Sequence, residues 1–235
     1  GIAHNLVSSS QTSYDDPDHT GGNEFGVHTH DSPTDPLPPS AVPNRIDVFE
    51  AGRQFPVPAV DFAGLTADLA QMKADAQANG KYFAGSGGLG YRIVLNSNDT
   101  FDLFRVNSLV SPPSGCSDGA TGWGTWSIRT TAGSETFLAN HQNPVNGIIF
   151  LEDHLWIEGQ INTARITIAV ARFPDNPATR PSITVNNNLT YTNYDGQDVV
   201  GLIAQNNFNV GLRSANNLRI DAALIAPNGR IGRYH

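Results

Sequence analysis

The hydrophobic residues between residues 61 and 79 recur at the period of an α-helix. In DFAGLTADLAQMKADAQAN they stand three or four positions apart, at Leu65, Leu69, Met72 and Ala76. This spacing places them on one face of a helix. Asp61 precedes the pattern as a cap, and Gly80 ends it. We therefore predict one amphipathic helix over this segment.

Beyond residue 80 the pattern changes to that of β-strands. The apolar stretches become short and rich in β-branched residues, as in YRIVL, TFDLFRV, GIIFL, ARITIAVARF, SITV and VVGLIA. Asn, Gly, Pro and Asp separate these stretches, and they are the residues of turns. The chain has 22 asparagines and 23 glycines, and both types tolerate the left-handed backbone of tight corners. We expect a mainly β fold with many corners.

Four stretches of the β region form a weak internal repeat, in which an apolar triplet meets a polar corner. They are IFLEDHLWI (149–157), ITVNNNLTY (183–191), LIAQNNFNV (202–210) and LIAPNGRIG (224–232), and IVLNSND (93–99) resembles an earlier copy. The alignment makes Leu151, Val185, Ala204 and Ala226 equivalent, at intervals of 34, 19 and 22 residues. Intervals near 20 fit one coil of a solenoid, with a loop around FPDNPATRP inserted in the longest.

The repeat predicts the fold class and the division of the chain. Residues 81–235 are expected to form a solenoid-like domain, a right-handed parallel β-helix whose corner asparagines stack in hydrogen-bonded ladders. Residues 46–80 would form a connection and a capping helix. Residues 1–45 contain prolines at 33, 36, 38, 39 and 43, which disfavour regular structure, so this segment is expected to be an irregular arm or linker.

Composition excludes several partners. The net charge is -8, with two lysines and twelve arginines, so no basic surface is available for nucleic acid or anionic lipid. No apolar run approaches the roughly 18 residues of a membrane span. The chain starts at Gly1 without a signal-peptide pattern, which favours a portion of a longer protein, attached to a membrane only through an anchor upstream. Cys116 is alone and excludes an internal disulfide.

The stretch FLEDHLWIEG (150–159) gathers the acids of a sugar-cleaving enzyme. In the repeat, however, Glu152, Asp153 and His154 align with the polar corners Asn-Asn-Asn, Gln-Asn-Asn and Pro-Asn-Gly. In a straight strand, Glu152 and Glu158 would lie about 20 Å apart, whereas the paired carboxylates of glycosidases are about 5 to 9.5 Å apart. The prediction is a structural corner with no catalytic residue and no cofactor site.

Two other segments offer candidate binding residues. The arm could hold calcium or another metal ion through Asp15, Asp16, Asp18, His28, His30 and Asp31, although a solvated acidic arm is the favoured interpretation. Trp123, Trp126 and Trp156 are candidate glycan contacts, although buried packing is the favoured interpretation for tryptophan. The glycines of GSGGLG (85–90) follow a helix and precede a strand, the reverse of a dinucleotide-binding loop.

Three segments carry a resemblance to a known family. PVPAVDFAGLTADLAQMKADAQ, NGIIFLEDHLWIEGQINTARITIAVARF and NNLTYTNYDGQDVVGLIAQNNFNVGLRSANNLRIDAALIAPNGRIGRYH cover roughly residues 56–235. This region resembles the carboxy-terminal region of PilX-type pilus-assembly or pilin-like bacterial surface proteins. The resemblance implies an extracellular protein with a pilin-type amino-terminal helix, absent from this sequence, followed by β-rich coils. It implies no catalytic residues.

Taken together, these features predict a non-enzymatic, extracellular structural or adhesive module of a bacterial surface filament or pilus. Its expected partners are other copies of itself or filament subunits, because a solenoid that ends without a polar cap leaves open strand edges. Surface glycans are further candidate partners. The alternatives are a carbohydrate-active enzyme, for which Asp102, Glu152, Asp153 and Glu158 are the acids to test, and a glycan-binding module.

Overall fold

The computed structural model describes most of the chain after residue 62 and short parts before it. The described residues are 6–8, 32–33, 44–54, 57–58, 63–110, 127–211, 213–215 and 217–233, with the side chains of 63–67 and 233 left out. The chain divides into two compact units, Gly1–Asp61 and Phe62–His235. In the first unit, β1 (Val7–Ser8) pairs in parallel with β2 (Arg53–Gln54).

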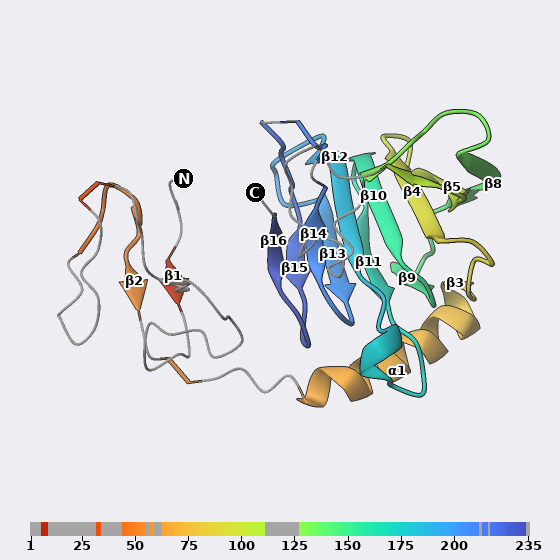
Figure 1. Ribbon diagram of the computed structural model, residues 1–235, viewed down its shortest axis with the longest axis horizontal. Coiled ribbons are helices and arrows are strands. Elements are labelled where there is room, and N and C mark those ends of the chain that lie inside the picture. The colour runs from red at the N-terminus through yellow and green to blue at the C-terminus, as the bar shows by residue number, and fades with distance from the viewer. Residues whose placement is uncertain are drawn as a thin grey trace. The chain divides into compact units, whose positions relative to one another are not determined.

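The second unit is mainly β, as the sequence predicts, and consists of two sheets joined at corners (Figure 1). The five-stranded sheet is entirely parallel and has the order β15 (Ala223–Ile225), β13 (Val199–Ala204), β11 (Arg165–Val170), β9 (Ile148–Leu151) and β3 (Lys81–Phe83). The second sheet has the order β16 (Ile231–Arg233), β14 (Phe208–Val210), β12 (Ile183–Tyr191), β10 (Leu155–Ile161), β4 (Gly90–Asn96), β5 (Thr100–Val106) and β8 (Glu135–Gln142). In this sheet the pairings of β4 with β5 and of β5 with β8 are antiparallel, and the others are parallel.

From β9 onward the chain alternates between the two sheets. Each strand of the five-stranded sheet is followed by a strand of the seven-stranded sheet, from β3 and β4 through β9 and β10 to β15 and β16. Other elements lie outside this alternation. β5 and β8 follow β4 in the seven-stranded sheet. β6 (Leu109–Val110) pairs with β7 (Ser127–Ile128), and the 3-10 helix η2 (Pro177–Thr179) lies between β11 and β12. Parallel neighbours are therefore separated in sequence by a whole excursion through the other sheet.

The main core lies between the two sheets and follows from the alternation of side chains along each strand. On β9, Ile149 and Leu151 belong to the cluster that also contains Ile157 and Val185 of the opposite sheet, whereas Phe150 belongs to a second cluster. All five side chains are at most 1% exposed. The five-stranded sheet is thus buried on both faces where β9 lies.

The helix α1 (Ala63–Asn79) provides the cover for that second cluster (Figure 1). Leu69 and Ala76 are buried against Phe150 and Ala169, as the helical spacing predicts. The helix ends before Gly80, where a Cβ atom would lie 2.5 Å from the Ile148 carbonyl oxygen. The predicted cap Asp61 lies outside the described residues. No described helix is long and apolar enough to cross a bilayer.

The alignment of the predicted repeat is wrong at one of its four copies. Leu151 pairs with Val170, and Val170 pairs with Ala204, so these three positions are equivalent in the five-stranded sheet. Val185 instead lies on β12 in the other sheet, opposite Ile157. The error arises because the three asparagines after Val185 form a bulge within a strand and not a corner between strands. In the structure, Leu151 and Val170 are 19 residues apart and Val170 and Ala204 are 34 apart, so the two predicted spacings occur in the opposite order.

A ladder of hydrogen bonds runs along the corners that precede the seven-stranded sheet. Ser182 donates its backbone N–H to His154 Nδ1 at 3.1 Å, Asn207 donates its N–H to Ser182 Oγ at 3.3 Å, and Arg230 donates its N–H to Asn207 Oδ1 at 2.8 Å. These four residues immediately precede β10, β12, β14 and β16. We call this set the corner ladder. The predicted ladder of corner asparagines thus has one asparagine among its three side-chain acceptors.

Candidate binding site

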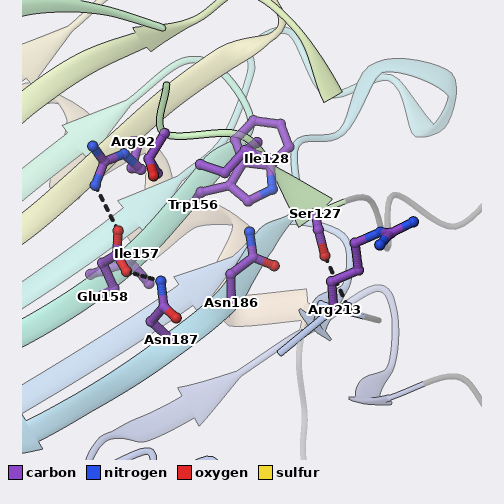
Figure 2. Close-up of a pocket in the computed structure, with 10 residues that line it drawn as sticks. Arg92, Ser127, Ile128, Trp156, Ile157, Glu158, Asn186, Asn187 and Arg213 are labelled. Atoms are coloured by element: carbon purple, nitrogen blue, oxygen red, sulfur yellow. Dashed lines mark hydrogen bonds and ion pairs between the residues drawn. The ribbon is translucent and has the colours of Figure 1, made fainter. Parts of the chain in front are cut away.

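A pocket of about 150 Å³ lies on the outer face of the seven-stranded sheet (Figure 2). Trp156 and Glu158 line it because they alternate on β10 with Leu155 and Ile157, which belong to the core. Ser127 and Ile128 of β7 form another side.

A bulge in β12 supplies the central side chain of this pocket. Ile157 pairs with Val185 and Gly159 pairs with Leu189, so three asparagines, 186–188, stand opposite Glu158 alone. Bulges of this kind redirect side chains and occur next to functional sites. Both polar atoms of the Asn186 amide are buried and have no hydrogen-bond partner among the described residues. Figure 2 shows this amide between Trp156 and Ser127.

Arg92 of β4 organises the charges beside the pocket. Its guanidinium forms two hydrogen bonds with the Glu135 carboxylate, at 2.7 and 2.6 Å, and a third with Glu158 at 2.6 Å. Burial lowers the pKa of Arg92, but the hydrogen bonds to Glu135 and the charges of both carboxylates outweigh it and raise that pKa above its ordinary value. Phe104 lies under the guanidinium, 4.1 Å from it. Asn187 donates a hydrogen bond to the remaining oxygen of Glu158.

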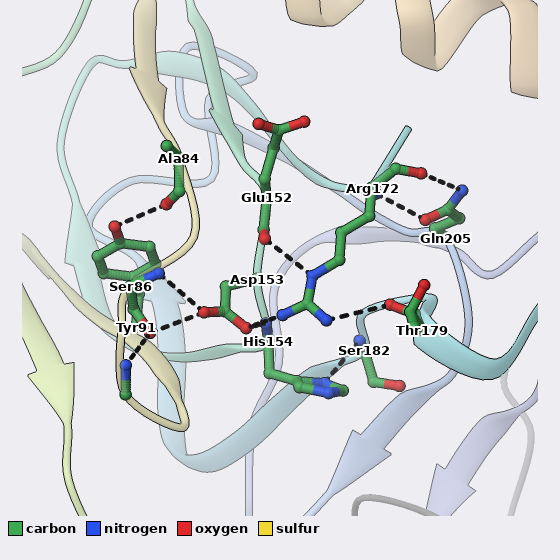
Figure 3. Close-up of polar contacts among 11 residues, drawn as sticks. Ala84, Ser86, Tyr91, Glu152, Asp153, His154, Arg172, Thr179, Ser182 and Gln205 are labelled. Carbon is green, nitrogen blue, oxygen red and sulfur yellow. Dashed lines mark hydrogen bonds and ion pairs between the residues drawn. The ribbon is translucent and has the colours of Figure 1, made fainter. Parts of the chain in front are cut away.

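The predicted corner at Glu152–His154 is confirmed, since these residues connect β9 to β10 (Figure 3). Asp153 is buried, and its Oδ2 accepts hydrogen bonds from the N–H of Ser86 at 2.9 Å and from the Ser86 hydroxyl at 2.7 Å. Its Oδ1 lies 2.5 Å from Arg172 Nη2. Arg172 also donates from Nε to the Glu152 carbonyl oxygen at 3.0 Å. The carboxylate joins two corners and the loop between β3 and β4.

The Glu152 side chain points away from that network and binds the helix. Lys73 Nζ lies 2.5 Å from Glu152 Oε1, and the Tyr82 hydroxyl donates to Oε2. The hydrogen bond to Glu152, followed by burial, raises the pKa of Tyr82 to about 12. Glu152 therefore connects α1, β3 and the corner after β9.

His154 completes the corner with an uncharged imidazole. Its Nδ1 accepts the Ser182 N–H, which requires that this nitrogen carry no proton. Burial lowers the pKa of His154, and the Asp153 carboxylate opposes that effect only in part. The fourth candidate acid, Asp102, accepts a hydrogen bond from Asn140 at 2.7 Å. The four acids therefore have partners of a structural kind.

The remaining predicted site residues divide between the pocket and the parts of the chain that are not described. Trp156 lines the pocket and is 5% exposed, so it forms a wall and does not offer a broad stacking surface. Trp123 and Trp126 lie outside the described residues. So do the six residues of the candidate metal site, Asp15, Asp16, Asp18, His28, His30 and Asp31. The described residues contain no group of three or more metal-binding side chains.

Sequence reasoning did not identify the pocket, because its residues come from separate strands and loops. The one local signal is the run of three asparagines at 186–188 inside a strand that is otherwise built of β-branched, apolar and aromatic residues. Comparisons of the chain with models of protein families, with curated proteins and with solved structures find no match. The chemistry that the pocket can support therefore follows from its own geometry.

Proposed function

We propose that this chain is a non-enzymatic structural or adhesive module of an extracellular bacterial surface filament, and that its two sheets are the faces of a short right-handed parallel β-helix. The observation that carries the proposal is the strand order. From β9 onward, successive strands alternate between the two sheets and add in one direction, which leaves β15 and β16 as the last strands of their sheets. The resemblance to pilin-like surface proteins supports the same function.

The last strands support association with another chain. Among the described residues, nothing pairs with the outer edges of β15 and β16. An unpaired edge presents backbone N–H and carbonyl groups that can hydrogen-bond a further strand. Ile231 on β16 is 51% exposed, so an apolar side chain accompanies this edge. Other copies of the chain or filament subunits are the partners that such an edge favours.

The arrangement of the acids supports a module without catalysis. Glu152 is paired with Lys73, and Glu158 with Arg92, in contacts that hold elements of the fold together. A polysaccharide-cleaving enzyme is the alternative of another class. Turnover on a polysaccharide panel that disappears in Glu158→Gln would replace our proposal with that alternative.

The edge can be tested by its effect on assembly. A lysine on an edge strand opposes strand addition, so Ile231→Lys is expected to reduce the mass of assemblies that light scattering detects at high concentration. Val145→Lys is the matched control. Val145 is fully exposed in the turn between β8 and β9, so this variant adds the same charge away from β15 and β16. A monomeric wild-type chain at every concentration would contradict the association.

The location can be tested in the source cells by immunogold electron microscopy with antibody raised against this chain. Label on filaments or their tips is the expected result. Label found only in the medium would contradict a filament role. Glycan binding is the second candidate function, because Trp156 lines a pocket that contains a buried amide with no described partner.

A further inference from the structure

The backbone around Asn186, in the pocket on the outer face of the seven-stranded sheet, is fixed by its own contacts. A Cβ atom on residue 211 would lie 1.7 Å from Asn186 Oδ1 and 3.1 Å from Ser127 Oγ, so glycine at this position leaves room for the amide. The Gly211 N–H is bonded to the Val185 carbonyl oxygen at 2.8 Å, and Ser127 Oγ accepts the Arg213 N–H at 3.1 Å. The backbone around Asn186 is therefore held on two sides.

The unpartnered amide defines the polar chemistry of a ligand. Buried polar groups in folded proteins nearly always have hydrogen-bond partners, and one that lacks a partner calls for an explanation, such as a bound water or ion. The Asn186 amide offers both a donor and an acceptor, at Nδ2 and Oδ1. Neighbouring hydroxyl groups of one molecule can satisfy both, because a hydroxyl donates as well as accepts.

The charges at the pocket balance one another and so favour a neutral ligand, because Arg92, Arg213 and Glu158 line it and Glu135 pairs with Arg92 beside it. The positive charge of Arg92 is shared between Glu135 and Glu158, which lie 2.6 Å from it. Glu158 has one oxygen on Arg92 and the other on Asn187, so both oxygens of its carboxylate have partners. An anion would meet this carboxylate, and a cation would have to compete with Arg92 for it.

The size and the walls of the pocket fit one ring. A space of about 150 Å³ is of the size that accommodates a single six-membered ring. Trp156 and Ile128 add apolar walls, and binding sites for small molecules combine such walls with a few placed polar groups.

From these features we infer that the pocket around Asn186 binds one neutral, hydroxylated six-membered ring, such as a single hexose unit of a glycan. The inference deepens the glycan-binding candidate and does not depend on filament assembly. Asn186 is the residue that recognises adjacent hydroxyls, and Trp156 bounds the ring.

The test is calorimetric titration of the whole chain with the methyl glycosides of glucose, galactose and mannose. At least one of the three glycosides is expected to bind. Asn186→Leu is expected to weaken that binding by about tenfold or more, because the sugar hydroxyls that bonded to the amide would be buried without a partner. Asn188→Leu is the matched control. Asn188 belongs to the same bulge but does not line the pocket, and it is expected to leave the affinity within about twofold.

Two further measurements separate binding from folding and from assembly. Asn186→Leu removes a buried amide without a described partner, so its thermal midpoint is expected to equal or exceed that of the wild type. Ile231→Lys is expected to bind the sugar as the wild type does, whatever its effect on association. No binding of any of the three glycosides, equal binding by Asn186→Leu, or tighter binding of inorganic phosphate would each overturn the inference.

Discussion

The Nδ1 atom of His154 accepts a hydrogen bond from the backbone N–H of Ser182, 28 residues further along the chain, at 3.1 Å. Only the uncharged imidazole can make this bond through Nδ1. The protonation state of one side chain is thereby connected to the contact between β10 and β12, which these two residues precede.

The first prediction concerns acid. Because burial lowers the pKa of His154 in the folded protein, the unfolded chain takes up a proton first as the pH falls below about 6.5. Stability is therefore full above that pH and decreases as the pH falls toward the lower folded pKa. The free energy of unfolding, measured with urea between neutral pH and pH ~5, is expected to decline with acid.

His154→Asn should make this decline shallower, because an amide oxygen can accept the Ser182 N–H and does not titrate. His141→Asn is the comparison. Burial also lowers the pKa of His141, which packs 5.3 Å from Phe83 and 5.2 Å from Phe101, so this variant should remove a separate part of the decline. An unchanged pH dependence in His154→Asn would refute the role given to the imidazole.

The second prediction concerns the tyrosine bound to Glu152. The pKa of Tyr82 is raised from 10.0 to about 12, first by its hydrogen bond to Glu152 and then by burial. The folded state therefore favours the neutral phenol, and this contribution to stability disappears as the pH rises from 10 through about 12. Glu152→Gln should move the titration toward 10, as NMR of the tyrosine ring carbons would detect. Tyr82→Phe identifies the resonance, and a titration near 10 in the wild type would contradict the contact.

The third prediction concerns the buried carboxylate of the corner. Asp153→Ala removes the partner of Arg172 and leaves the Ser86 N–H without its acceptor. Breaking a buried ion pair on one side costs about 3 to 5 kcal/mol, and since the Arg172 side chain is 37% exposed, we expect the lower end of that range in urea unfolding. Asp195→Ala is the control, because Asp195 is exposed and, among the described residues, its hydrogen bonds go to Gln197 in its own turn. Its effect should stay below about 0.5 kcal/mol, and equal losses in both variants would contradict the prediction.

The fourth prediction concerns a close approach of two strands at Gly159. Gly159 on β10 has a φ of +114°, and a Cβ atom there would lie 2.2 Å from the Leu95 carbonyl oxygen on β4. Gly159→Ala therefore combines backbone strain, about 1 to 3 kcal/mol, with overpacking of similar size. A loss of roughly 3 kcal/mol or more is expected in denaturant unfolding.

Gly196→Ala separates the two contributions. Gly196 also has a positive φ, +83°, but nothing lies within 4 Å of the added Cβ. In Gly196→Ala the loss of unfolding free energy should be limited to the backbone strain. A loss as large as that of Gly159→Ala would show that the contact with Leu95 adds nothing.

The features that could be predicted from the sequence are those that local periodicity determines. The helix ends before Gly80, as predicted, and the corner at Glu152–His154 could be predicted because an apolar triplet before a polar run is a short-range signal. The strand β8 was not predicted. Phe137 and Leu138, two successive apolar residues on it, are both exposed, so its sequence lacks the alternation of a half-buried strand.

Register and the pocket depend on residues far apart in sequence. Asn186–Asn188 have the composition of a corner, and only the pairing of β12 with β10 makes them a bulge opposite Glu158. Arg92 and Glu135 are 43 residues apart, and no spacing rule brings them together. The pattern of apolar residues specifies which side chains are buried, whereas the identity of the neighbouring strand determines which polar groups meet.

The corner ladder has a mechanical consequence for a protein under tension. A force directed from strand to neighbouring strand would act along the backbone hydrogen bonds that join the strands of both sheets. An outermost strand would then separate one hydrogen bond at a time. The bonds His154–Ser182, Ser182–Asn207 and Asn207–Arg230 fasten β12 to β10, β14 to β12 and β16 to β14, outside the sheet itself. Rupture that begins at β16 would proceed toward β10 as successive, separately resisted steps, because each of these three bonds must break in turn.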